Sequence, residues 1–174
     1  MRIFVGSSAS EDISKEYMDD CRKMLEVVLK EHDLVFGACN LGLMGISYEI
    51  AKKNHRSVTG ICPEFYQDSL KEIDCDQEVL TTTMLDSTLK IYQNCDAMLF
   101  LPGGFGTIYE FFTANYSKIC KDVDVPIILY DCNGFYDEIV SFIDKVHQAG
   151  FIKDKQMDQF KVAHNAEEVL SYLK

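Results

Sequence analysis

Apolar residues follow two alternating spacings along the chain. Short, nearly continuous apolar runs, rich in β-branched and aromatic residues, recur between longer segments in which apolar positions return every three or four residues. The first pattern is typical of buried strands, and the second is typical of helices that bury one face. Strands are expected at 2–7, 32–38, 57–63, 96–102, 125–131 and 159–164, and helices at 11–30, 43–54, 83–95, 106–119, 134–150 and 166–173.

The regular alternation of strand and helix predicts an α/β fold. Parallel strands need long crossover connections, and helices supply them, so we expect a Rossmann-like, doubly wound, mainly parallel sheet with helices on both faces. The polar, irregular segment 64–80 interrupts the alternation and is expected to be a long loop. Because no repeat, low-complexity segment or shift in composition marks a boundary, residues 1–174 are expected to form one domain.

Three glycine-containing segments follow expected strands. They are GSSAS at 6–10, GACNLGLMG at 37–45 and PGGFGT at 102–107. In an open parallel sheet, ligands bind beyond the carboxyl ends of the strands, near the point where the strand order reverses. We therefore expect a binding site at this edge of the sheet.

The PGGFGT segment combines backbone freedom with the start of an expected helix. Gly103, Gly104 and Gly106 let a ligand approach the main chain, where successive N–H groups and the helix N-terminus attract an anion. Thr107 can cap the helix or donate its hydroxyl to a phosphate oxygen. A tight turn that needs glycine for packing alone is the other explanation. Three glycines in four residues favour a phosphate site.

Glu110 lies three residues after Thr107. This is the spacing of a capping box, in which the carboxylate would serve only the start of the helix. The alternative is a carboxylate beside a bound sugar phosphate. Cleavage of a glycosidic bond passes through an oxocarbenium-like transition state, which such a carboxylate stabilises. The local sequence leaves both interpretations open.

The other two glycine segments supply further candidate contacts. Ser7 and Ser8 could donate hydrogen bonds to a phosphate or a ribose, although serines after a strand often cap a helix. Gly42 is a candidate phosphate contact, and Met44 either packs in the core or forms a wall of a base pocket. The glycine spacing in GACNLGLMG does not match G-x-G-x-x-G, so a dinucleotide-dependent dehydrogenase is not favoured.

The composition of the chain argues against several kinds of binding partner. A formal net charge of −11 argues against nucleic-acid binding, and no apolar run approaches the length of a membrane span. The N-terminus does not resemble a secretory signal, so we expect a cytoplasmic protein. The seven cysteines contain no C-x-x-C pair, and no cysteine or histidine spacing supports a metal site. We therefore expect reduced thiols and no metal.

The glycine motifs resemble those of the Lonely Guy (LOG) family of cytokinin riboside 5′-monophosphate phosphoribohydrolases, often labelled lysine decarboxylases. The family's PGGxGTxxE motif is matched by Pro102, Gly103, Gly104, Gly106, Thr107 and Glu110. Its GGGxxGLMG segment is matched in part by Gly37, Gly42, Leu43, Met44 and Gly45.

This resemblance implies hydrolysis of the N-glycosidic bond of a nucleoside 5′-monophosphate, which gives a free base and ribose 5-phosphate. It also implies that the reaction uses no cofactor, that the ligand is a small nucleoside monophosphate or related sugar phosphate, and that the protein is a homodimer. By resemblance, the glycine loop holds the phosphate and Glu110 acts at the ribose.

The chain departs from the family at a pair of positions associated with catalysis. Family members carry an Arg-Lys pair ahead of the central strand, and the corresponding positions are Ser87 and Thr88. Lys90 lies about one helical turn further on and is a candidate catalytic cation, although an ammonium group cannot reproduce the bidentate fork of arginine.

Three functional hypotheses follow. The first is a phosphoribohydrolase with Glu110 and Lys90 as catalytic residues. The second, motivated by the missing Arg-Lys pair, is a nucleotide sensor that has lost catalysis. The third is a base-exchange enzyme similar to a nucleoside deoxyribosyltransferase, which the phosphate-binding glycine loop makes less favourable.

Overall fold

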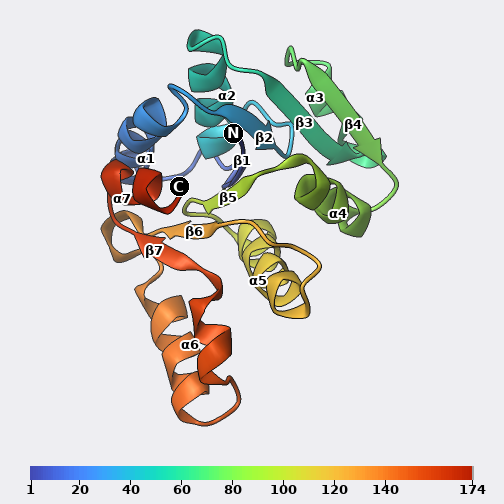
Figure 1. Ribbon diagram of the computed structural model, residues 1–174. Coiled ribbons are helices and arrows are strands. Elements are labelled where there is room, and N and C mark those ends of the chain that lie inside the picture. The colour runs from blue at the N-terminus through green and yellow to red at the C-terminus, as the bar shows by residue number, and fades with distance from the viewer. Residues whose placement is uncertain (174) are drawn as a thin grey trace.

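A parallel sheet of seven strands forms the centre of the protein. The computed structural model describes residues 1–173 and is shown in Figure 1. The strand order is β4-β3-β2-β1-β5-β6-β7, and every neighbouring pair is parallel. The strands are β1 (Arg2–Gly6), β2 (Asp33–Phe36), β3 (Val58–Pro63), β4 (Gln77–Thr81), β5 (Ala97–Phe100), β6 (Ile127–Tyr130) and β7 (Lys161–Ala163). The expectation of a Rossmann-like parallel sheet is confirmed.

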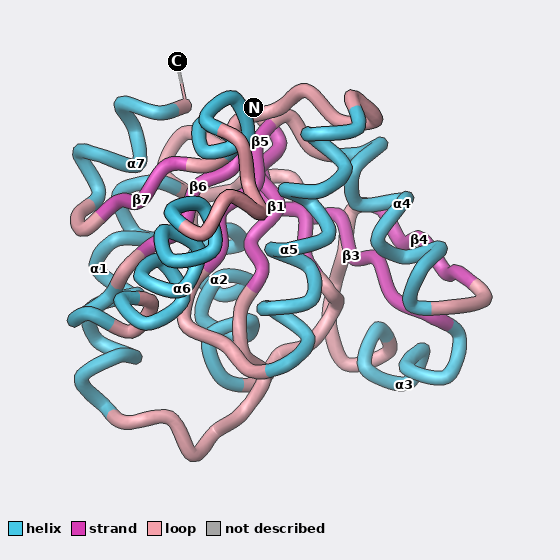
Figure 2. The backbone as a smooth tube through the Cα atoms, turned by 90° about the horizontal axis from the view of Figure 1, so that it is seen from below, coloured by secondary structure: helices cyan, strands magenta, loops and turns pink. Residues whose placement is uncertain are grey.

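Helices cover both faces of the sheet, as expected. They are α1 (Lys15–Val28), α2 (Gly42–Lys53), α3 (Gln67–Leu70), α4 (Met84–Asn94), α5 (Phe105–Cys120), α6 (Asp137–Gln148) and α7 (Ala166–Tyr172), with short 3₁₀ turns η1 (Glu64–Tyr66), η2 (Cys132–Gly134) and η3 (Asp154–Gln159). One buried cluster joins α1, α2 and α7 to the sheet, and a second joins α4, α5 and α6 to the opposite face. Figure 2, viewed from the side of α6, shows α5 and α6 in front of the strands.

Successive residues along the central strands belong alternately to one of these two buried clusters and to the other. In β1, Ile3 and Val5 belong to the cluster with α1 and α2, whereas Phe4 belongs to the cluster with α4 and α5. In β5, Leu99 belongs to the cluster with α1 and α2, and Phe100 belongs to the cluster with α4 and α5. Both faces are apolar, which explains why these strands appear in the sequence as continuous apolar runs.

Segment 64–80 differs from its expected structure. Instead of one long loop, it forms η1, the short helix α3 and most of the edge strand β4. β4 has a single neighbour, pairing through Ile61 with Val79 and Cys62 with Leu80, and most of its side chains are exposed. An edge strand that faces solvent carries polar residues, so its sequence lacks the apolar run that marks the inner strands.

The strand order reverses at β1. This strand pairs with β2 on one side and with β5 on the other. The chain therefore builds outward from β1 to β4, returns to β5 beside β1, and continues outward to β7. The loops that leave β1 and β5 diverge at the carboxyl edge of the sheet, where a crevice for a ligand is expected. No helix within residues 1–173 combines the length and the apolar character that a membrane span needs.

Candidate functional site

A cavity of about 430 Å³ lies at this reversal point. The loop after β1, the start of α2, the end of β3, the first turns of α4 and the start of α5 all contribute to its walls. Most of the residues selected from the sequence line it, namely Ser7, Ser8, Met44, Gly104, Gly106, Thr107 and Glu110. Segments separated by up to about a hundred residues in sequence therefore meet in one site.

The first turn of α5 presents open backbone to the cavity. The helix begins at Phe105 with Gly104 as its N-cap, and the first helical hydrogen bond runs from the Ile108 N–H to the Gly104 carbonyl. The preceding N–H groups have no acceptor within the helix. No atom lies within 4 Å of the place where a Cβ at Gly104 or Gly106 would stand. A phosphate can therefore approach these N–H groups directly, with the helix dipole in its favour.

Thr107 and Glu110 do not form a capping box. Thr107 is the third residue of α5 rather than its N-cap, and Glu110 lies in the second turn. The Thr107 side chain is buried against Gly103, where any Cβ would collide with the threonine hydroxyl. Gly103 thus makes room for the Thr107 side chain, whereas Gly104 and Gly106 line the cavity. The capping explanation for Glu110 is wrong.

Glu110 is the ionisable carboxyl group of the cavity wall. Burial raises the pKa of this carboxyl group from its ordinary 4.5 to about 7. Within residues 1–173, no ion pair or side-chain hydrogen bond offsets the loss of hydration. A carboxylate held without a partner is costly for the fold, and such groups concentrate at functional sites.

Ser7 offers a free hydroxyl to the cavity, whereas Ser8 organises the protein. Ser7 is buried, and its Oγ has no hydrogen-bond partner among the described residues. The Ser8 Oγ accepts a hydrogen bond from the Ser10 N–H at 3.1 Å, and the Ser8 carbonyl accepts hydrogen bonds from the first N–H groups of α2. The N-terminus of α2 is therefore occupied by the chain itself. Ser7 is the better candidate for a ligand contact.

Gly42 lies behind the wall rather than in it. Its φ is +56°, a conformation that favours glycine, and a Cβ there would approach the Ser8 carbonyl oxygen to 2.8 Å. This glycine lets the loop after β1 pass over the start of α2. Met44 does line the cavity, and its terminal methyl group covers Gly37, where a Cβ would lie 2.7 Å from it.

Lys90 lies outside the cavity lining. Its side chain is exposed on α4, and the ammonium group donates a hydrogen bond to Gln93 Oε1 at 3.2 Å. Ser87 lines the cavity instead, and its hydroxyl shares a hydrogen bond with the hydroxyl of Thr81. The described residues that line the cavity include no lysine or arginine. Ser87, at the position of the family's arginine, thus lines the cavity, whereas Lys90 does not.

Sequence reasoning missed one part of the cavity wall. This wall is formed by side chains from the end of β3, η1, α3 and α4, including Ile61, Cys62, Tyr66, Ser69, Met84 and Ile91. Cys39, from the second glycine segment, also contributes. Ile61, Cys62, Tyr66, Ser69 and Ile91 belong to no recognisable local motif. Their contribution depends on the tertiary arrangement of β3, η1, α3 and α4. The described residues contain no group of three or more histidine, cysteine or acidic side chains arranged to hold a metal ion.

The shifted pKa of Glu110 predicts a pH-dependent effect on stability. The folded pKa of about 7 exceeds the ordinary 4.5, so the unfolded chain loses this proton first as the pH rises. The free energy of unfolding should therefore fall between about pH 4.5 and 7. Glu110→Gln removes this penalty, and we expect it to raise the free energy of unfolding by up to about 3 kcal/mol at about pH 8, with little change near pH 4.

Urea unfolding at both pH values measures this effect. Glu138→Gln, at an exposed position of α6, is the matched control and should change little at either pH. Equal effects of Glu110→Gln at both pH values, or destabilisation near pH 8, would show that ionisation of this carboxyl group does not destabilise the fold.

Comparisons with known proteins agree with the sequence motifs. The sequence profile of a family described as "possible lysine decarboxylase" matches residues 44–173. Two cytokinin riboside 5′-monophosphate phosphoribohydrolases of Arabidopsis thaliana, LOG5 and LOG1, are each 30% identical to this chain. Both alignments cover 98% of this chain, and they cover 75% and 80% of the respective relatives.

Solved structures support the fold. The molybdenum cofactor binding protein of Rippkaea orientalis superposes with a TM-score of 0.69 at 18% identity, over 98% of this chain and 93% of that chain. The molybdenum cofactor carrier protein of Chlamydomonas reinhardtii gives 0.70 at 16% identity, over 99% and 96% of the two chains. At these identities the likeness concerns the fold alone. The motifs, the matched profile and the relatives together show that the chain belongs to the LOG family, the family described as possible lysine decarboxylase.

Proposed function

We propose that this protein is a nucleoside 5′-monophosphate phosphoribohydrolase, a hydrolase that acts on N-glycosyl bonds. The observation that carries the proposal is the desolvated Glu110 carboxyl group in the same cavity as the open N-terminus of α5. The Glu110 carboxylate can stabilise a developing positive charge, and the N-terminus of α5 can bind a phosphate. The names of the relatives at 30% identity describe this reaction.

The 5′-phosphate binds at the first turn of α5 in this proposal. Gly104 and Gly106 expose backbone there, and Thr107 completes the wall. Backbone N–H groups and the helix dipole are local sources of positive potential. They can hold a phosphate although the chain as a whole carries a formal charge of −11.

Glu110 acts at the ribose. As the bond between C1′ and the base nitrogen breaks, the bonding electrons leave with the base, and positive charge grows on the ring. The ionised carboxylate stabilises this charge and orients water for attack. The water oxygen bonds to C1′, and its released proton balances the protonation of the base. The unpartnered Ser7 hydroxyl is placed to hold a ribose oxygen. The reaction requires no cofactor.

Lys90 takes no part in the proposed reaction, because its side chain lies outside the cavity. Its ammonium group is bonded to Gln93 outside the cavity, so Glu110 and the helix N-terminus carry the proposed chemistry. The absence of a lysine or arginine from the described cavity lining favours one competing function, a nucleotide sensor that binds without turnover.

We expect the wild-type protein to release free base from at least one common nucleoside or deoxynucleoside 5′-monophosphate and not from the matching nucleoside. Glu110→Gln should lower kcat by at least about a hundredfold, because the transition state loses its countercharge, and should leave ligand binding within about twofold. Chromatography of the released base and a thermal shift with the same ligands measure these two quantities.

The control is Glu138→Gln, which should retain full activity. Binding without base release by the wild-type protein would favour the sensor. Release that depends on an added acceptor base would indicate base exchange, and unchanged turnover in Glu110→Gln would remove Glu110 from the mechanism.

We further propose that the protein is a homodimer that pairs through α4 and α5. Phe105, Tyr109, Phe112 and Tyr116 recur along one side of α5 and are exposed, with Tyr116 68% exposed. On α4, which covers the same sheet face, Leu85 and Leu89 are also exposed. A monomer rarely leaves so many large apolar side chains in water, and a second copy of the chain can cover such a face symmetrically.

We expect the wild-type protein to sediment at twice the 19.9 kDa of the chain. Tyr116→Asp should shift it to monomers at micromolar concentration, because a symmetric interface would bury two new carboxylates. Phe142→Asp, on α6 and 60% exposed, is the matched control and should remain dimeric. A monomeric wild type, or a Tyr116→Asp variant that stays dimeric, would rule out this interface.

We place the protein in the cytoplasm. All seven cysteines are free thiols in the structure, including the exposed Cys120. Free thiols persist in a reducing compartment, which supports this location.

A further inference from the structure

A second concave site lies at the far end of α5. It is a groove of about 480 Å³ between the last turn of α5 and η3, and we call it the lysine groove. Its lining residues are Lys118, Ile119, Lys121, Lys153, Lys155, Gln156 and Gln159. α5 has 16 residues, which at 1.5 Å per residue places the lysine groove roughly 24 Å from the first turn that lines the cavity.

The charge of this groove opposes that of the whole chain. The sequence has 28 acidic residues and 17 lysines and arginines, yet four of the lysines line this one groove. None of its described lining residues is acidic. Within residues 1–173, none of the four lysines forms an ion pair with a carboxylate. Four like charges that share a groove repel one another, and a bound anion would relieve that repulsion.

The lysines come from two separate segments. Lys118 and Lys121 lie at the C-terminus of α5, where a cation favours the helix dipole without any ligand. That explanation does not apply to Lys153, the N-cap residue of η3, or to Lys155, its second residue. Their convergence on the end of α5 is a tertiary feature, since α5 packs against η3.

Hydrogen bonds fix the backbone that carries two of these lysines. The Lys153 N–H donates to Gln156 Oε1 at 3.0 Å, and Gln159 Nε2 donates to the Lys155 carbonyl at 3.0 Å. The glutamines thus hold the turn in shape from within the groove. A fixed backbone lowers the cost of ordering the lysines around a ligand.

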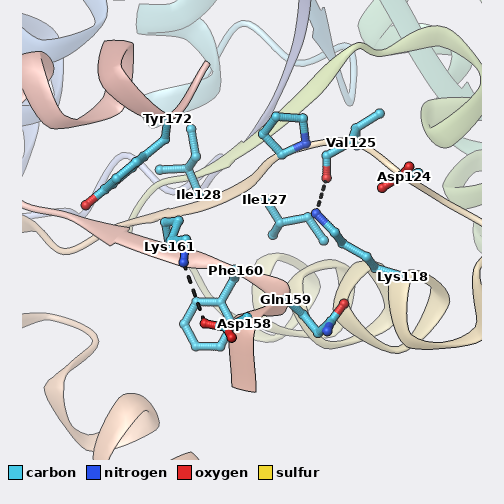
Figure 3. Close-up of a pocket in the computed structure, with 11 residues that line it drawn as sticks. Lys118, Asp124, Val125, Ile127, Ile128, Asp158, Gln159, Phe160, Lys161 and Tyr172 are labelled. Atoms are coloured by element: carbon cyan, nitrogen blue, oxygen red, sulfur yellow. Dashed lines mark hydrogen bonds and ion pairs between the residues drawn. The ribbon is translucent and has the colours of Figure 1, made fainter. Parts of the chain in front are cut away.

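A neighbouring groove at the start of β6 shares two residues with this one, Lys118 and Gln159. Figure 3 shows it, with the Lys118 ammonium group directed at the Val125 carbonyl, to which it donates at 2.7 Å. Two carboxylates, Asp124 and Asp158, line that neighbouring groove, and Asp158 is paired there with Lys161 at 3.7 Å. Asp154, between Lys153 and Lys155 in sequence, is paired with His147 at 2.8 Å. The described lining of the lysine groove itself thus consists of lysines, glutamines and one isoleucine.

We propose that the lysine groove binds a small anion that carries several phosphate groups. Lysine ammonium groups bind phosphate oxygens as compact point charges. Lys118 is already bonded to the Val125 carbonyl. Lys121, Lys153 and Lys155 are therefore the ammonium groups that match a ligand with more than one phosphate. The groove volume exceeds the need of a single phosphate ion. This site is separate from the proposed catalytic cavity and does not depend on the proposed hydrolase activity.

Inorganic tripolyphosphate is the probe that tests this proposal, with binding measured by isothermal titration calorimetry at low ionic strength. We expect saturable binding that weakens as salt is added. The double variant Lys153→Gln with Lys155→Gln should bind roughly tenfold more weakly, because two ionic contacts are lost. The control, Lys23→Gln with Lys30→Gln on the α1 side, changes the net charge equally at exposed positions and should bind like the wild type.

Three results would overturn the proposal. The first is the absence of saturable binding to the wild-type protein at low salt. The second is equal weakening in both double variants, which would indicate a response to net charge alone. Inorganic monophosphate and citrate form the comparison arms, and binding of citrate as tight as that of tripolyphosphate would contradict the assignment to phosphate groups.

Discussion

β1 pairs with β2 on one side and with β5 on the other, and the position of the cavity follows from this arrangement. Successive crossovers build outward from β1 in opposite directions, so the loops after β1 and β5 separate at the carboxyl edge. The gap admits a ligand because no crossover covers it. Buried apolar residues on both faces of β1 and β5 hold this junction rigid, and a rigid junction fixes the start of α5 relative to Ser7.

Two electrostatic features of opposite sign meet in the resulting cavity. The N-terminus of α5 offers partial positive charge and free N–H groups, and Glu110, one turn further along the same helix, offers a carboxyl group that burial makes reluctant to ionise. A nucleoside monophosphate carries its negative charge at one end and develops positive charge at C1′ during glycosidic cleavage. The two features therefore match the substrate in its transition state. The small hydroxyl of Ser87 leaves the carboxylate without a neighbouring guanidinium.

Much of the architecture could be predicted from the sequence because buried parallel strands carry continuous apolar runs. β4 escaped prediction for the converse reason, since an exposed edge strand has polar side chains. The glycine motif indicated the edge of the sheet where the cavity lies, but local spacing could not tell that Thr107 is the third residue of α5 rather than its cap. It also could not tell that Gly42 and Gly103 serve packing, or that the helix phase of α4 directs Lys90 away from the cavity. Those outcomes depend on tertiary contacts.

The central claim is that ionised Glu110 stabilises the transition state of base release. The pH dependence of kcat/KM for a nucleoside monophosphate substrate tests it most directly. The account predicts that kcat/KM rises with pH and levels off above a midpoint near 7, the pKa of this carboxyl group. The second ionisation of a phosphate monoester falls near 6, so the same profile recorded for Glu110→Gln separates the contribution of the substrate. A profile that falls with rising pH, or one whose shape is unchanged in Glu110→Gln, would contradict the account.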